Sequence, residues 1–172
     1  LMVLTLKDGT VRIEELSGKG SPILLKEATT KLHRATPSAD GSAIVTTADD
    51  NLVRVWRPSG NTWKAVVHRD LGRKVLQASL SFDGKRLVTA SGNDTVLVGS
   101  ADGQGEATAL RVEGDRIEAA SFSADGRYVL GRAHARNLYV WPAAGGVPRV
   151  MAGAHDGAIA WAGWGPEGTR AL

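Results

Sequence analysis

Hydrophobic residues recur at every second position through most of the chain. Val53 and Val55 flank Arg54, and Val96 and Val98 repeat this spacing. A period of two that is rich in β-branched residues is typical of strands with one buried face. No window has the 3.6-residue period of an amphipathic helix. The pattern therefore predicts an all-β protein with almost no helix.

Turn-forming residues divide the chain at regular intervals. Four pairs lie 43, 42 and 42 residues apart, namely Asp40-Gly41, Asp83-Gly84, Asp125-Gly126 and Glu167-Gly168. A second landmark keeps the same phase, because extended segments end at Glu14, Trp56, Gly99 and Trp141. Such pairs supply the positive-φ positions that tight hairpins need. Two landmarks in step predict a structural repeat of four units.

Each full unit is predicted to form four short antiparallel strands. In the second unit they span 32–37, 43–48, 51–57 and 62–68. The predicted units are 1–31, which lacks its inner strand, then 32–74, 75–116 and 117–157, and an incomplete unit 158–172.

Such a unit is too small to bury both faces of its own sheet. Stacking the units around an axis removes those faces from water, which favours a β-propeller segment of about four four-stranded antiparallel blades. A linear solenoid is the structural alternative.

The repeated segments resemble those of the WD40-repeat family over the whole chain. The resemblance rests on FSADG at 122–126 and on DDNLVRVW at 49–56. Trp56 and Trp141 stand where the family has the Trp of its Trp-Asp dipeptide, although Arg57 and Pro142 replace the Asp. The resemblance implies structural roles for Asp8, Asp50, Ser91 and His155, besides the two tryptophans.

The resemblance also implies rings of seven or eight blades. We therefore expect the chain to be part of a larger ring, which neighbouring blades from the rest of the chain or from a second copy complete. The alternative is a closed four-bladed ring, in which Asp8 meets His155.

Composition excludes several classes of protein. The 172 residues include no cysteine, which rules out disulfide frameworks and thiolate metal sites. No apolar stretch is long enough to span a membrane, and no signal peptide is recognisable. We expect a cytoplasmic protein, and abundant Ala, Gly and Arg with little Lys suggest a bacterial source. A net charge of +3 does not indicate nucleic acid.

Catalytic motifs are not found in the sequence. The four histidines lack the spacing of zinc ligands, and there is no G-x-S-x-G motif. The adjacent carboxylates Asp49 and Asp50 point to opposite faces of an extended chain. We therefore expect no catalytic residue, no cofactor and no metal, and we predict that the segment is not an enzyme.

Basic residues gather on the loops before the inner strands and between the second and third strands. We predict that these residues bind a partner: Lys31, Arg73, Lys74, Arg116, Arg132, His134 and Arg136. In the alternative interpretation they are solvated charges interspersed with Asp49, Asp70, Asp115 and Asp156. We expect Trp161, on an inner strand, to pack in the core or to line the channel.

These observations favour a non-catalytic protein–protein interaction scaffold, or a regulatory sensor module, within a larger multidomain protein. Its partner would be a protein or peptide on the loop face, with no membrane contact. One alternative is a propeller enzyme with an active site at the channel mouth, where the sequence places mostly apolar residues. Another is nucleic-acid binding through the basic face, which is disfavoured because aromatic residues do not interleave with the arginines.

Overall fold

The chain is all-β over the residues that its structure describes. The computed structural model describes residues 2–6, 8–14, 21–26, 32–68, 75–134, 136–151 and 159–165. These residues form fifteen strands and no helix, so the predicted fold class is confirmed. None of them belongs to a helix of the length and apolarity that crossing a bilayer requires.

The strands form four antiparallel sheets, each a meander of strands that follow one another in the chain. The first sheet contains β1 (Met2–Thr5), β2 (Thr10–Glu14) and β3 (Ile23–Lys26). The second contains β4 (Leu32–Pro37), β5 (Ile44–Ala48), β6 (Val53–Ser59) and β7 (Thr62–His68). The third contains β8 (Gln77–Leu80), β9 (Arg86–Ala90), β10 (Thr95–Ser100) and β11 (Thr108–Arg111). The fourth contains β12 (Ile117–Phe122), β13 (Tyr128–Ala133), β14 (Leu138–Pro142) and β15 (Arg149–Met151).

The four strands predicted for the second unit are found within two residues of their expected bounds. The largest difference is at β6, which begins at Val53 instead of residue 51. Asn51 adopts a positive φ of 60°, and Asp50 Oδ1 accepts a hydrogen bond of 3.0 Å from the Leu52 amide. This Asp-based turn takes up the residues that the alternating pattern had assigned to the strand.

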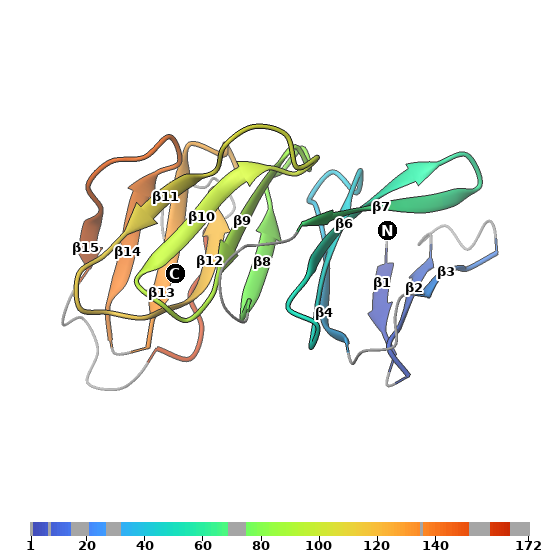
Figure 1. Cartoon of the computed structure of the whole chain (residues 1–172), viewed down its shortest axis with the longest axis horizontal. Coiled ribbons are helices and arrows are strands. Elements are labelled where there is room, and N and C mark those ends of the chain that lie inside the picture. Colours follow the sequence, from blue (N-terminus) through green and yellow to red (C-terminus); the bar gives the residue numbers. More distant parts are fainter. Residues whose placement is uncertain are drawn as a thin grey trace.

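The four sheets lie side by side in chain order as blades of a propeller-like arc (Figure 1). The second strand of one sheet packs against the inner strand of the next, as β5 does on β8 and β9 does on β12. The strand β1 packs on β4 in the same way. It therefore occupies the second position of its blade, and the described part of the first blade contains no inner strand. The described residues do not close into a ring.

The hydrophobic core lies between the blades. One cluster joins Val11 and Ile13 of the first sheet to Ile44 and Trp56 of the second. A second cluster joins the second and third sheets, for example through Val55 and Leu87, and a third joins the third and fourth sheets. Full burial of one such side chain contributes about 1.5–3 kcal/mol. Each blade is thus stabilised mainly by its neighbours.

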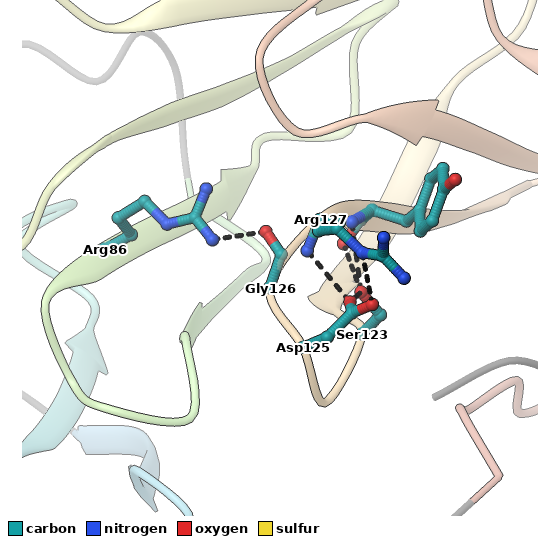
Figure 2. Close-up of polar contacts among 6 residues, drawn as sticks. Arg86, Ser123, Asp125, Gly126 and Arg127 are labelled. Atoms are coloured by element: carbon teal, nitrogen blue, oxygen red, sulfur yellow. Dashed lines mark hydrogen bonds and ion pairs between the residues drawn. The ribbon is translucent and has the colours of Figure 1, made fainter. Parts of the chain in front are cut away.

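The Asp-Gly pairs form a repeated hydrogen-bonded turn between the first and second strands of each full blade. In the fourth blade, Ser123 Oγ donates to Asp125 Oδ1 at 2.6 Å and accepts from the Tyr128 amide at 3.0 Å (Figure 2). The same Ser–Asp hydrogen bond is 2.7 Å long in the second blade and in the third. Gly126 has a φ of 67°, a conformation that glycine adopts without steric cost.

These turns also connect neighbouring blades. The Arg86 guanidinium of the third blade donates to the Gly126 carbonyl of the fourth (Figure 2). Arg57 of the second blade donates to the Gly84 carbonyl of the third at 2.5 Å. The turn glycines of the third and fourth blades are therefore each held by an arginine of the blade before.

The structure describes five of the six residues to which the resemblance gave structural roles. Trp56 is buried on β6, and its indole Nε1 donates to Thr46 Oγ1 on β5 at 3.0 Å. Trp141 is buried on β14 and donates to the Arg111 carbonyl at 3.4 Å. Three further residues occupy the ends and turns between second and third strands, namely Asp8, Asp50 and Ser91. His155 lies outside the described residues.

Candidate functional site: a cleft between inner strands

Two inner strands carry an irregularity at the same place. The pairing of β4 with β5 shifts between Leu32 and Arg34, and that of β12 with β13 shifts between Ile117 and Ala119. Each shift leaves one extra residue, His33 in β4 and Glu118 in β12. A β-bulge of this kind re-aims a side chain, and such bulges are frequent beside functional sites.

Each extra residue pairs with the end of the second strand or with the loop that follows it. His33 Nε2 lies 2.7 Å from Asp49 Oδ1. Glu118 Oε1 lies 2.6 Å from His134 Nδ1, and Glu118 Oε2 accepts from the Arg132 guanidinium at 3.0 Å. The hydrogen bond from His134, and then that from Arg132, lower the pKa of Glu118 against the opposing effect of burial. Glu118 is therefore held as a carboxylate.

The inner strands border two adjoining hollows, which together we call the inner-strand cleft. The larger has a volume of about 430 Å³ between β4, the start of β8 and β12, and the smaller, of about 140 Å³, continues along β12 and β13. Arg34, Gln77 and Arg132 line both hollows. The cleft is thus formed by three blades and by residues 160–162, which complete the wall of the smaller hollow.

Three side chains of the cleft have unused binding capacity. Arg34 is exposed and makes no ion pair with any residue that the structure describes. Gln77 is half-buried, and its amide makes no hydrogen bond within the described segments. The indole of Trp161 is 71% exposed. The guanidinium of Arg34, the amide of Gln77 and the indole of Trp161 therefore all line the smaller hollow.

Arg132 holds the segment 159–165, whose residues 160–162 form one wall of the smaller hollow. Besides Glu118, its guanidinium binds the Ile159 carbonyl at 3.1 Å. Trp164 Nε1 donates to the Ser121 carbonyl of β12 at 3.2 Å. These two hydrogen bonds hold the segment 159–165 against the fourth blade and place Trp161 at the cleft.

The predicted partner-binding residues have different environments. Lys31, Arg73 and Lys74 lie outside the described residues. The others lie where β12 begins and β13 ends: Arg116, Arg132, His134 and Arg136.

Three of these four make contacts within the chain. Arg116 Nε donates to the Gly92 carbonyl at 2.9 Å, and Arg132 and His134 both bind Glu118. Arg136 is exposed and forms no ion pair with a described residue. Arg132 is the one described member that lines the cleft.

Several residues of the cleft were not anticipated from the sequence. His33 and Glu118 are 85 residues apart, as are their partners Asp49 and His134. The 85 residues equal two repeats, so the two pairs occupy equivalent places in their blades, with the histidine and the acid interchanged. This equivalence was the signal in the sequence that would have identified both pairs. Asp49 is therefore not a merely solvated charge. Trp161 was expected on an inner strand, packed in the core or lining the channel. It lies outside any strand and is 71% exposed, so it does not pack in the core, and the described residues close no channel.

The described residues show no arrangement for metal binding, because no three of their His, Asp and Glu side chains converge around one point. No protein-family model matches the chain. Fold and cleft together define its class, which is an all-β protein of propeller-like blades with a polar and aromatic cleft between inner strands.

Proposed function

We propose that the chain is a non-catalytic interaction module, a WD40-like segment of a larger propeller within a multidomain protein. The inner-strand cleft carries this proposal, because it combines an unpaired guanidinium on β4, a free amide on β8 and the exposed indole of Trp161 in the segment 159–165. Variable side chains held by a stiff scaffold are suited to docking. A location in the cytoplasm of a bacterium is part of the proposal and rests on composition alone.

The chemistry of the cleft favours a peptide that carries a carboxylate. Glu118 is occupied by His134 and Arg132, and Asp49 by His33, so Arg34 is the one cation among the described cleft residues that has no ion-pair partner. A guanidinium binds a carboxylate through two parallel hydrogen bonds. An apolar side chain of the same peptide would pack on Trp161, since exposed aromatic residues anchor many interfaces.

The test is direct binding of a fluorescent peptide of alternating Glu and Leu, beside a matched peptide of Gln and Leu. The account expects tighter binding of the Glu peptide by roughly tenfold or more, the value of one charge-assisted hydrogen bond. Arg34→Gln should remove this preference, and reversal of Arg136 to Glu should weaken capture further. Arg149→Gln on β15, an exposed arginine outside the cleft, should leave the preference unchanged.

Three outcomes contradict the proposal. Equal affinity for both peptides in the unmodified chain would remove the role of the cleft. Tighter, salt-dependent binding of a polynucleotide than of the Glu peptide would favour the basic-face alternative. A substrate-dependent activity that is lost with Arg34→Gln would favour the enzyme alternative.

A further inference from the structure

A separate hollow, which we call the interblade pocket, lies between the second and third blades. It shares no described lining residue with the inner-strand cleft. It has a volume of about 260 Å³. Its walls come from the last residue of β7, from β9 and β10, and from the loop between β10 and β11. This volume is below the ~300–1,000 Å³ of pockets for drug-sized ligands, so the hollow suits only a smaller molecule.

One wall offers a hydrogen-bond acceptor. His68 is buried, and its Nε2 lies 3.1 Å from the Ala101 carbonyl oxygen across the blade boundary. A carbonyl only accepts, so Nε2 carries the proton, and Nδ1 of the neutral ring is an acceptor. Nδ1 makes no hydrogen bond with any described residue. The Cε1 edge of the ring faces Gly103, whose added Cβ would lie 3.8 Å away.

A second polar group in the wall is also without a partner. Thr89 is 2% exposed, and its hydroxyl forms no hydrogen bond within the described part of the chain. A buried hydroxyl without a partner is unfavourable, so this group indicates a ligand or an ordered water at the hollow. The hydroxyl can donate or accept.

The remaining described lining is uncharged, and its polar side chains are those of Ser100, which donates to Asp102, and Gln104. Leu87, Leu97 and Ala107 form much of it, and no Asp, Glu, Lys or Arg belongs to its described lining. A charged ligand would lose its hydration without gaining a counter-charge. The loop residues Gln104 and Gly105 are exposed and form the entrance.

Glycine keeps the hollow open. A Cβ on Gly99 would lie 3.5 Å from the Ala107 Cβ, which is ordinary contact, and a larger side chain there would enter the space. A Cβ on Gly105 would meet nothing within 4 Å.

We propose that this interblade pocket binds a small uncharged molecule of about the size of phenol. Its hydroxyl or N–H donates to His68 Nδ1, and its apolar body lies against Leu87 and Leu97. Because the ligand touches two blades, its binding also favours their association. The inference is independent of the proposed peptide-binding function.

The experiment titrates phenol into the intact chain and follows the methyl signals of Thr89, Leu97 and Ala107 by NMR. The expected result is a saturable shift confined to the pocket, with phenol binding tighter than toluene and benzoate binding weakest. His68→Phe should keep toluene binding and reduce the preference for phenol by roughly two- to tenfold, the value of one hydrogen bond. Tyr128→Phe on β13, an exposed aromatic residue outside the pocket, is the control and should change nothing.

Two further measurements keep the proposal falsifiable. Gly99→Val should fill the hollow and abolish binding of both neutral probes. In the unmodified chain, the His68 Nδ1 resonance should move on addition of phenol and stay unchanged with toluene. Shifts that do not saturate, equal affinity for phenol and toluene, or equal affinity for benzoate would overturn the proposal and leave solvent water as the occupant.

Discussion

At the scale of single residues, the repeated Ser–Asp turn is the most regular feature of the chain. Ser123 is 1% exposed, and its hydroxyl both donates to Asp125 and accepts from the Tyr128 amide. Ser38 and Ser81 make the corresponding pair of hydrogen bonds in their blades. The turn therefore satisfies a partly buried backbone N–H that the hairpin would otherwise leave without a protein partner.

Ser123→Ala tests this function of the hydroxyl. Removing it leaves the Tyr128 amide without an acceptor, so the free energy of unfolding in urea should fall by about 1–3 kcal/mol. Ser100→Ala is the matched control, because Ser100 Oγ donates only to Asp102, and its loss should be smaller. An equal decrease in the free energy of unfolding in the two variants would mean that the Tyr128 amide does not depend on Ser123.

The turn carboxylates predict an acid-sensitive fold. The amide of Ser42 is the largest cause that lowers the pKa of Asp40, and the hydroxyls of Ser81 and Ser123 act likewise on Asp83 and Asp125. A folded-state pKa below the unfolded value stabilises the fold above the ordinary Asp pKa of about 3.9, and this contribution is lost as pH falls through the folded-state pKa.

Urea unfolding between pH 7 and pH 2.5 should therefore give a free energy that is flat near neutrality and decreases below about pH 4. Asp83→Asn should reduce the size of this decrease, because one of the titrating groups is removed. A free energy that rises on acidification, or an unchanged pH dependence in the variant, would contradict the assignment.

At the scale of strands, the alternating pattern predicted β4 to β7 closely because their buried positions and their turns agree. The pattern analysis did not identify the bulges at His33 and Glu118, although the extra residue lengthens one spacing between buried positions from two to three, for example from Ile117 to Ala120. Nor did it show that β6 starts after an Asp-based turn. Local hydrogen bonds of Asp50 and the positive φ of Asn51 decided that boundary.

Gly131 tests how tightly strands and tryptophans pack. A Cβ on Gly131 would lie 2.8 Å from the Cη2 atom of Trp141, closer than real contacts allow. Gly131→Ala should therefore cost about 1–3 kcal/mol through overpacking. Gly99→Ala on β10 is the matched control, because its Cβ would make only ordinary contact with Ala107. Thermal unfolding should give a lower melting temperature for Gly131→Ala than for Gly99→Ala. Equal melting temperatures would show that Trp141 moves aside without cost.

At the scale of the whole molecule, the repeat predicted which sheets pack together but not what lies between their inner strands. The inner-strand cleft draws Arg34, Gln77 and Arg132 from three different blades, and no local motif marks such a combination. The loop-face prediction identified Arg132 and His134 by position, yet Glu118, which binds both, was absent from it. Charge alone does not indicate which basic side chains are already paired within the fold.

The central claim is that a hydrophobic alternation with a repeat of 42 or 43 residues forms blades that cover one another. Two backbone contacts between blades test it most directly: the Ile117 amide donates to the Asn93 carbonyl at 2.7 Å, and the Asp40 amide to the Phe82 carbonyl at 3.2 Å. NMR of the uniformly labelled chain should show nuclear Overhauser effects across both pairs and slow exchange of both amides. Sheet boundaries that do not follow the 42- or 43-residue repeat, or helical contacts in these segments, would contradict the account.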